Sequence, residues 1–555
     1  MNFGDFMDIS GKKSEARLRE IQEEFTLPFF RGKDQAKWRA APKKIVVIGS
    51  GIGGMASGAL FAKLGHQVTV LEQNPELIGG HGRCLNINGL RFSMGPQYVW
   101  DFGEGGLGDR FMQFLDIKAA NPFVPMQADG FERIFIGDRG SDCNYFFLDF
   151  KVPLGLENFC QQLQRLFPDE RENLAALFSD LIAMFNAYKT FFRKQSAKEG
   201  RFLQATRFML AGKVPVAMKI KLGRTIYQSL SAFFDQYQIS PVLRRVLYGH
   251  GGIFAETESD MSTIAYIVGT GNYHEGAWYP ENGFFQFFDS LAGVIQQAGG
   301  RVETGKQVVR LERENDAITR AVCADGSSYH CDAIFSDISP RLTCQLMEKT
   351  EAAESFNYTP SHCVPTCCIG VRNGLEAIAG MKGRNCWWQQ GCAVNYHDPD
   401  VTAPPRMLFI GSPTANGFGR PAGCPDDALV VFCPGNYAQE KKIHAQGPDA
   451  VRHFKYKLAA DIVGILDRNV FPGIKSRLLF AEIISSVDIE AHTGGERGNA
   501  YGRRLSVDEI LKGAIKEENA PTNLYNVSAT KNSPGIAGGI ATAELIFKEL
   551  TGRVI

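Results

Sequence analysis

The sequence lacks any stretch that approaches the roughly 18 consecutive apolar residues of a membrane-spanning helix. Residues 1–13 contain no apolar core of the kind that a secretory signal needs. Four glutamates between residues 15 and 24 argue against an organellar transit peptide. We therefore expect a cytoplasmic protein, or one that attaches to a membrane peripherally.

The sequence also has no excess of charge of either sign. Its 60 Lys and Arg residues equal its 60 Asp and Glu residues, so no overall field draws the chain to nucleic acid. The 13 cysteines form neither a CxxC pair nor a ligand spacing with histidine, which gives no reason to expect a metal site. We expect most of them to be reduced and buried, as suits a reducing compartment. No Ser/His/Asp or paired-carboxylate arrangement stands out.

At 555 residues the chain is too long for one small core, so two domains, or one large domain with an insertion, are expected. Residues 1–42 are interpreted as an N-terminal extension. The β-branched run 43–48 predicts a buried parallel strand. A helix is predicted over 55–64 and a second strand over 67–71, which completes a βαβ unit.

Further along, residues 150–280 carry Leu and Phe at helical spacing and predict a largely helical region. A helix is expected over 284–298. A β-meander is expected with strands over 307–311, 318–323 and 328–335. Near the C-terminus, a strand is expected over 523–527 and a helix over 536–550.

A glycine-rich motif follows the first predicted strand. The run reads Gly49, Ser50, Gly51, Ile52, Gly53 and Gly54, and fits GxGxxG. Gly49 would permit the tight turn, Gly51 the close approach of a pyrophosphate, and Gly54 the packing of the helix on the sheet. The pyrophosphate would then meet the free N–H groups and the positive dipole of the helix N-terminus.

The context of the motif strengthens this prediction. Glu72 closes the second strand, near the spacing expected for the acid that binds the ribose hydroxyls. Its carboxylate would repel a 2′-phosphate, which disfavours NADP at this site. The glycine-lined stretches 77–83 and 88–96 follow at once and suit a cofactor that extends beyond the pyrophosphate, so FAD is favoured over NAD.

These residues resemble the phytoene desaturase superfamily of FAD enzymes, and within it the branch that holds carotenoid isomerase and retinol saturase. The resemblance covers four blocks: 43–96, 273–283, 300–337 and 523–550. It implies an α/β fold with a Rossmann-type FAD-binding domain, into which a mixed α+β, largely helical substrate domain is inserted. The implied FAD-binding domain comprises 43–150, 281–345 and 480–555, and the implied substrate-binding domain comprises 151–280 and 346–479.

The resemblance also implies a set of cofactor-binding residues. Val308 matches the position that lies along the adenine, and Arg83 fits the arginine that approaches the flavin. The segment 528–530 stands where the family often has an acid, so its hydroxyls would donate to cofactor oxygens instead. The full predicted set is Gly49, Gly51, Ile52, Gly53, Gly54, Glu72, Gln73, Gly80, Gly82, Arg83, Gly95, Pro96, Gln97, Val308, Ser528, Ala529, Thr530, Gly535, Ile536 and Ala537.

Members of the family act on carotenoids, retinoids and other polyenes, which have no charged group that a protein could bind. A long apolar tunnel would have to bind such a substrate, and some of the 40 Phe residues could line it. Candidates for the active site follow glycine-rich turns or precede the helix of the second block. They are Tyr98, Trp100, His250, His274 and Tyr279.

A basic, amphipathic stretch lies between Lys189 and Arg224. It holds ten basic residues, opposed by Glu199, with apolar residues interleaved. This pattern is typical of a segment that binds a membrane surface, and also of a solvated helix face.

We therefore expect an FAD-dependent oxidoreductase or isomerase that acts on the conjugated double bonds of an apolar polyene. NAD(P)H, a quinone or oxygen would be its redox partner. One alternative is a flavin oxidase or isomerase of a polyunsaturated fatty acid or an amine. Another is a non-catalytic prenyl- or lipid-binding protein with the fold of the Rab GDP-dissociation inhibitors.

Overall fold

The structure is a computed structural model that describes residues 38, 41–139, 147–191, 216–348, 356–391, 396–512, 515, 520–531 and 533–555. Most of the predicted extension, 1–42, lies outside the described residues. So does the segment 192–215, which forms the middle of the basic stretch.

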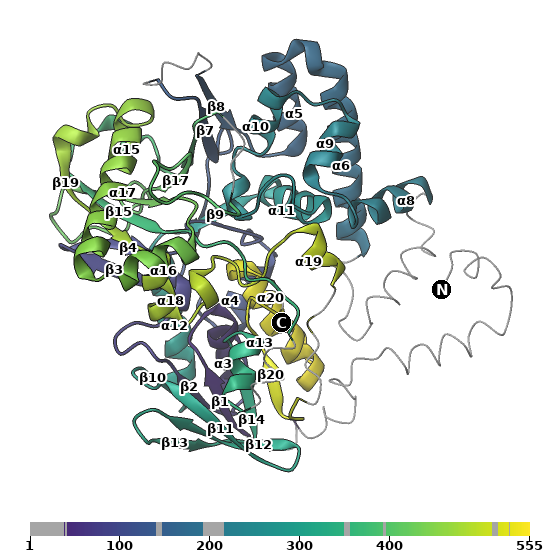
Figure 1. The fold of residues 1–555 in the computed structure, drawn as a ribbon. Coiled ribbons are helices and arrows are strands. Elements are labelled where there is room, and N and C mark those ends of the chain that lie inside the picture. The colour runs from purple at the N-terminus through teal and green to yellow at the C-terminus, as the bar shows by residue number, and fades with distance from the viewer. Residues whose placement is uncertain are drawn as a thin grey trace, which may run out of the picture.

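A five-stranded parallel sheet forms the first layer of the molecule (Figure 1). Its order is β10-β2-β1-β14-β20, with bounds Arg301–Glu303, Gln67–Leu71, Lys44–Ile48, Ala333–Ser336 and Leu524–Asn526. The strands predicted over 43–48, 67–71 and 523–527 are thereby confirmed. Four of the five residues of β1 are buried, as expected of a central strand that is covered on both faces.

Successive side chains of β1 point to opposite faces of this sheet. Ile45 and Val47 pack in a core with helices α3, α12, α20 and α4, which span Ile52–Lys63, Gly283–Gln297, Gly535–Thr551 and Leu107–Phe114. Val46 and Ile48 pack in a second core with β11 (Val308–Glu314) and β12 (Ala317–Cys323). Helices thus cover one face and a small antiparallel sheet covers the other, and the helices predicted over 55–64, 284–298 and 536–550 are confirmed.

The prediction of one strand over 328–335 was wrong. Residues Ser328–His330 form β13, which completes the antiparallel sheet β11-β12-β13, whereas Ala333–Ser336 form β14 of the parallel sheet. The burial patterns differ, because β13 is mostly exposed and all four residues of β14 are buried. A short exposed antiparallel strand and a fully buried parallel strand follow one another here, and the sequence pattern merged them.

A seven-stranded mixed sheet forms the second region (Figure 1). Its order is β19-β15-β18-β17-β16-β7-β8, with bounds Leu478–Ile484, Thr366–Val371, Asp427–Phe432, Met407–Gly411, Asn385–Gln389, Glu132–Ile136 and Leu148–Val152. Helices α15 (Glu376–Ala379) and α17 (Pro448–Asn469) share a core with one face of this sheet. The domain division remains a proposal, and because β7, β8 and β19 pair within this sheet, we propose that these strands belong to the substrate-binding region.

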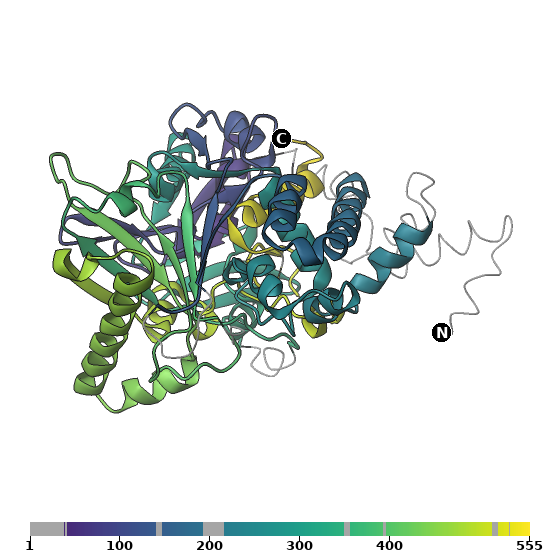
Figure 2. The same ribbon diagram turned by 90° about the horizontal axis from the view of Figure 1, so that it is seen from above.

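Helices cover the other face of the seven-stranded sheet, as Figure 2 shows from above. Ile134 of β7, Trp387 of β16 and Phe409 of β17 pack in one core with them. The helices are α5, α6, α8, α9, α10 and α11, with bounds Leu156–Leu166, Arg171–Phe191, Val216–Thr225, Leu230–Gln236, Pro241–Leu247 and Thr263–Glu275. The largely helical region predicted over 150–280 is confirmed.

Two smaller sheets complete the fold. The hairpin β3-β4 spans Cys84–Ile87 and Leu90–Ser93, and the sheet β5-β9-β6 spans Val99–Trp100, Ala277–Pro280 and Phe123–Pro125. Within the described residues, no helix combines the length and the apolar character that crossing a bilayer requires.

Candidate functional site

A cavity of about 470 Å³ lies between the carboxyl ends of the parallel strands and the seven-stranded sheet. One end of it is lined by glycine-rich segments that follow β1, β2 and β20, and we call this the nucleotide end. The other end is lined by side chains of α11 and of strands β16, β17 and β18, and we call this the apolar end. The carboxyl edge of an open parallel sheet is the usual location of a ligand in this class of fold.

The turn after β1 requires glycine at several positions. Gly49 has φ of +90°, which other residues rarely adopt. A Cβ on Gly53 would lie 2.1 Å from the carbonyl oxygen of Val527, and one on Gly54 would lie 2.4 Å from that of Gly49. The motif therefore lets α3 pack closely on the sheet and against the segment after β20.

Glu72 lines the cavity at the end of β2 and is only 7% exposed. Its Oε2 accepts hydrogen bonds from the backbone N–H (3.0 Å) and the hydroxyl (2.5 Å) of Ser50, and its Oε1 accepts one from the N–H of Asn74 (2.8 Å). Ser50 Oγ in turn accepts a hydrogen bond from the N–H of Gly79 at 3.0 Å. The carboxylate is held in place as a fixed acceptor, as a ribose hydroxyl pair would require.

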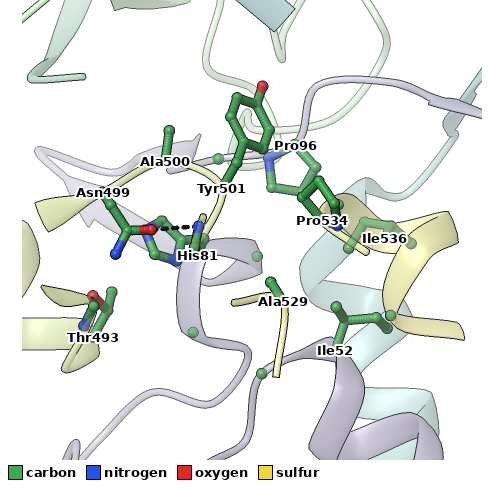
Figure 3. Close-up of a pocket in the computed structure, with 18 of the residues that line it drawn as sticks. Ile52, His81, Pro96, Thr493, Asn499, Ala500, Tyr501, Ala529, Pro534 and Ile536 are labelled. Atoms are coloured by element: carbon green, nitrogen blue, oxygen red, sulfur yellow. Dashed lines mark hydrogen bonds between the residues drawn. The ribbon is translucent and has the colours of Figure 1, made fainter. Parts of the chain in front are cut away.

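Two helix N-termini face the nucleotide end. Helix α3 begins after Gly51 and helix α20 begins after Pro534, and neither has a side chain that caps its first N–H groups. Figure 3 shows Ile52 and Ile536 facing each other across this end of the pocket. A Cβ on Gly539 would lie 2.5 Å from the Ile52 side chain, so glycine permits the close approach of the two helices. The uncapped N–H groups and the two positive dipoles suit a diphosphate.

The segment after β2 forms a glycine-lined wall. Gly79 and Gly80 have positive φ, and a Cβ on Gly82 would lie 2.1 Å from the ring of Phe288. The Arg83 side chain is 4% exposed, and its Nε is without a hydrogen-bond partner. Burial lowers the pKa of Arg83, an effect that the Glu72 carboxylate opposes. A buried guanidinium with an unused donor at a cavity wall is suited to an anionic or carbonyl oxygen of a ligand.

The apolar end has a floor of aromatic rings. The register of the seven-stranded sheet pairs Trp387 with Phe409, and Phe409 with Phe432, on adjacent strands. Their ring centroids lie 4.7 Å and 5.4 Å apart, and all three side chains line the cavity. We call these three residues the aromatic row.

Helix α11 lies opposite the aromatic row. Its residues that line the cavity are Ala265, Val268, Gly269, Asn272 and Tyr273, a spacing of three and four that follows one helix face. Tyr98, from the loop before β5, packs against Tyr273 with ring centroids 4.8 Å apart. The Asp, Glu and Arg side chains in the lining are Glu72, Arg83, Asp337 and Glu496, and none of them belongs to α11 or to the aromatic row.

The structure brings most of the predicted cofactor residues to this cavity. Gly54, Gln73 and Val308 are not in its lining, since Gly54 lies inside α3 and Val308 begins β11. Those that line it are Gly49, Gly51, Ile52, Gly53, Glu72, Gly80, Gly82, Arg83, Gly95, Pro96, Gln97, Ser528, Ala529, Thr530, Gly535, Ile536 and Ala537.

The predicted catalytic candidates divide into two groups. Tyr98 and Trp100 line the cavity, whereas His250, His274 and Tyr279 do not. His274 stacks on the ring of Phe159 at 5.1 Å, and burial lowers its pKa to about 3. Burial likewise lowers the pKa of His250 to about 4. Both imidazoles are therefore neutral side chains within the helical core.

Several lining residues were missed from the sequence. Asp337 follows β14, and a Cβ on Gly51 would lie 2.3 Å from its Oδ2, so this carboxyl group sits under the glycine turn. Burial, and then the nearby Glu72, raise the pKa of Asp337 well above its usual value. Figure 3 also shows Asn499, Ala500 and Tyr501 beside His81 and Pro96 at the junction of the two ends. No motif marks these residues, because segments distant in the sequence bring them together.

Within the described part of the chain, no group of three or more His, Cys, Asp or Glu residues could hold a metal ion. Nine of the eleven cysteines described there are buried.

Two family models match the chain. Residues 47–116 match an NAD(P)-binding Rossmann-like domain, and residues 142–368 match the flavin containing amine oxidoreductases. Among solved structures, an oxidoreductase from Methanosarcina mazei has a TM-score of 0.58 at 16% identity and covers 90% of this chain and 99% of its own. A redesigned putrescine oxidase has a TM-score of 0.60 at 10% identity and covers 92% and 99%. These structures establish the Rossmann-type α/β fold of flavin oxidoreductases.

Curated relatives match over nearly the whole chain. The 1-hydroxycarotenoid 3,4-desaturase of Flavobacterium sp. (strain P99-3) is 25% identical over 528 residues, which cover 92% of this chain and 99% of the relative. The all-trans-retinol 13,14-reductase of Macaca fascicularis is 27% identical over 547 residues, covering 92% and 85%. The lycopene-forming phytoene desaturase of Pseudescherichia vulneris is 21% identical and covers 92% and 100%. The chain thus belongs to the phytoene desaturase superfamily of flavin-dependent oxidoreductases, in the branch similar to retinol saturase.

Proposed function

We propose that the chain binds FAD and acts as an oxidoreductase or isomerase on the conjugated double bonds of an apolar polyene. The observation that carries this proposal is one continuous cavity with two chemically different ends. The nucleotide end offers backbone N–H groups, two helix N-termini and a fixed carboxylate, and the apolar end offers an aromatic floor and an apolar helix face.

FAD fits the nucleotide end better than a mononucleotide does. The two helix N-termini would hold the diphosphate, and Glu72 would accept hydrogen bonds from the ribose hydroxyls. The wall from Gly79 to Arg83 would border the rest of the cofactor, with the unused Nε of Arg83 as a donor. When bound, the flavin would supply hydride or single-electron chemistry, and the protein would supply orientation and a dry site.

A polyene fits the apolar end because its affinity must come from burial of apolar surface. The aromatic row and the facing side of α11 would hold a flat conjugated chain between them. The curated relatives are named for reactions on carotenoids and retinol, which are substrates of this kind.

An amine substrate is less well supported. An ammonium group is best held beside a carboxylate, and the acidic side chains in the lining belong to the nucleotide end or its border. The likeness to putrescine oxidase therefore concerns the fold and not the substrate.

The test is direct. Purified protein should carry a flavin absorption band, and the released cofactor should have the mass of FAD. The flavin should then be reduced under anaerobic conditions and mixed with all-trans-retinol or a hydroxycarotenoid. A product that differs in hydrogen content or in double-bond geometry supports the proposal. A colourless protein that does not take up added FAD would falsify it.

We propose further that NAD(P)H, a quinone or oxygen exchanges electrons with the flavin. Stopped-flow mixing of each with the oxidised or photoreduced protein identifies the partner by its rate.

Peripheral contact with a membrane through 189–224 is also proposed. In the described part of this stretch, Ile220 is 47% exposed, and the neighbouring Tyr227 is 72% exposed. Lys189 and Lys221 pair with Glu275 and Asp180, which reduces the free positive charge. Co-sedimentation with anionic vesicles at low salt, but not with neutral vesicles, is the expected result.

A further inference from the structure

A buried carboxyl group lies directly behind the wall of the apolar end. Glu132 begins β7, is 0% exposed, and does not itself line the cavity. The parallel register of β7 and β16 pairs Glu132 with Asn385 and Ile134 with Trp387, so Glu132 and Trp387 lie on the same face of the sheet. Trp387 Nε1 donates a hydrogen bond to Glu132 Oε2 and fixes the position of the carboxyl group.

Tyr98 connects this carboxyl group to the cavity. Its side chain lines the apolar end and is 8% exposed, and its ring packs against Tyr273 of α11. The Tyr98 hydroxyl lies close enough to the Glu132 carboxyl group for each to shift the pKa of the other. Tyr98 Oη and Glu132 Oε1 do not form a hydrogen bond of good geometry here, and neither atom has another partner. Such contacts at reaction sites are often long without ligand and shorten when substrate binds.

The surroundings of Glu132 keep it protonated at neutral pH. Its contacts are the N–H of Trp387 and the hydroxyl of Tyr98, which are neutral groups. A buried carboxyl group that no cation compensates stays neutral, because ionisation without solvent is costly. Burial accordingly raises the pKa of Glu132 from 4.5 to about 8, although the nearby Tyr98 hydroxyl and the N–H of Trp387 oppose the shift.

The other titratable groups around Glu132 do not supply a positive charge that would favour its ionised form. The Tyr98 and Tyr273 hydroxyls have pKa values raised above the ordinary value, chiefly by burial, and His274 is neutral. Arg133, Asp149 and Lys151 lie on the opposite face of β7 and β8, since they pair out of phase with Glu132. The titratable groups on the elements around Glu132 are Tyr98, Tyr273 and Tyr501 at the cavity, His274 on α11, Arg244 and Arg245 on α10, Cys386 on β16, and Arg133, Asp149 and Lys151 on the far face of the sheet.

We propose that Glu132 and Tyr98 form a proton relay that delivers a proton to the bound polyene, so that the chain works in the reducing direction. This inference rests on the proposed function. Saturation of one double bond adds a hydride, which would come from the flavin after reduction by an external two-electron donor, and a proton. The Tyr98 O–H bond breaks as the new C–H bond forms on the substrate. The proton of Glu132 then restores the Tyr98 hydroxyl, and solvent reprotonates Glu132 between turnovers.

Within the relay, Tyr98 is the catalytic residue, because it faces the substrate space. Glu132 acts through Tyr98, so its contribution must appear in the pH profile and in kcat rather than in substrate binding. The Glu132→Gln substitution keeps the size of the side chain and the acceptor for Trp387, but removes the acidic proton that the relay transfers.

The experiment measures turnover of all-trans-retinol and of a 1-hydroxycarotenoid by the flavin-loaded protein across the pH range. For the wild type, kcat should fall as pH rises through about 8, where Glu132 loses its proton. In Glu132→Gln, kcat should fall by about a hundredfold and lose this pH break, with KM changed less than about twofold. Tyr98→Phe should cause a similar loss, and the double variant should be no slower than either single variant. Glu132→Asp should recover part of the rate and the pH break.

Glu440→Gln is the matched control, because Glu440 is also 0% exposed and burial raises its pKa to about 7, but it does not line the cavity or contact Tyr98. It should keep the wild-type profile. An unchanged profile in Glu132→Gln, or a wild-type rate that rises with pH, overturns the relay alone. A flavin-loaded wild type that turns over neither polyene overturns the proposed function, and the relay with it.

Discussion

The two ends of the cavity differ in whether backbone groups or side chains form most of their surface. The nucleotide end is made of backbone: a glycine turn, two helix N-termini and one carboxylate held by N–H groups. The apolar end is made of side chains that come from α11, from three strands of the second sheet and from the loop before β5. The comparison shows that a site formed by backbone depends on few positions and tolerates little change there. A site formed by packed side chains spreads its contribution over many positions.

The largest effect should follow from a side chain added to the glycine turn. Gly51→Val would place a Cβ 2.3 Å from Asp337 Oδ2 and would fill the space that the diphosphate needs. Flavin affinity, measured by fluorescence titration, should fall about a hundredfold or more, which is roughly 3 kcal/mol. The control is Gly293→Ala in α12, where an added Cβ has no neighbour within 4 Å. Its flavin affinity should be unchanged and its stability higher by up to about 1 kcal/mol. Equal flavin binding by Gly51→Val and the wild type would contradict the assignment of this end.

A smaller effect is expected when the acceptor changes but the backbone remains. Glu72→Gln loses the charge that accepts hydrogen bonds from Ser50 and that would accept them from the ribose hydroxyls, so flavin affinity should fall about ten- to a hundredfold. Isothermal titration with FAD measures it. Glu76→Gln, at an exposed position four residues away in sequence, should bind FAD as the wild type does. If the two variants behave alike, Glu72 does not contact the cofactor.

The buried proton behind the apolar end can be detected without any substrate. Between about pH 4.5 and 8 the native protein keeps a proton on Glu132 that the unfolded chain releases, so this group makes stability fall as pH rises through that window. The Glu132→Gln variant lacks this pH-dependent contribution to stability. As pH rises through this window, the Tm of the wild type should therefore fall by a few degrees relative to the Tm of Glu132→Gln. A difference in Tm that stays flat across this window would mean that the native protein does not hold a proton on Glu132 there.

The smallest effect should follow from one change in the aromatic row. Phe409→Leu keeps an apolar residue at the centre of the row but loses ring contacts with Trp387 and Phe432. KM for a polyene should rise about three- to tenfold, roughly 1 kcal/mol, with the flavin spectrum unchanged. Phe150→Leu, in the same core but outside the cavity lining, is the control for general destabilisation and should leave KM unchanged. A loss of flavin in Phe409→Leu would show that the two ends are not separable.

The same difference explains what the sequence could predict. The glycine turn and Glu72 lie within one βαβ unit, where spacing alone fixes their relation, and the parallel strands 44–48 and 67–71 were found for the same reason. Glu132 and Trp387 were not found, because they are 255 residues apart and meet only through the pairing of β7 with β16. No local pattern carries that pairing. His250 and His274 were candidates because of their places beside a glycine-rich turn and before the helix of the second block. Neither lines the cavity, and His274 packs against the rings of Phe131 and Phe159.

Asp337 shows an intermediate case. It directly follows β14, a strand that the sequence pattern merged with β13. Because the boundary of β14 was not recognised, the position of Asp337 at the carboxyl edge of the parallel sheet was not predicted. Once β14 is placed beside β1, a polar residue after its last position must lie near the glycine turn. A correct strand boundary would have been enough to find it.

The packing of the last helix against the first has a consequence for biosynthesis. One side of the proposed diphosphate site is formed by α3, near residue 52, and the other side by α20, which begins at Gly535. A ribosome must therefore translate almost the entire chain before both halves of that site exist. Under the proposed function, cofactor loading is therefore a late event, because a nascent chain that stalls before Gly535 lacks one of the two helix N-termini that would hold the diphosphate.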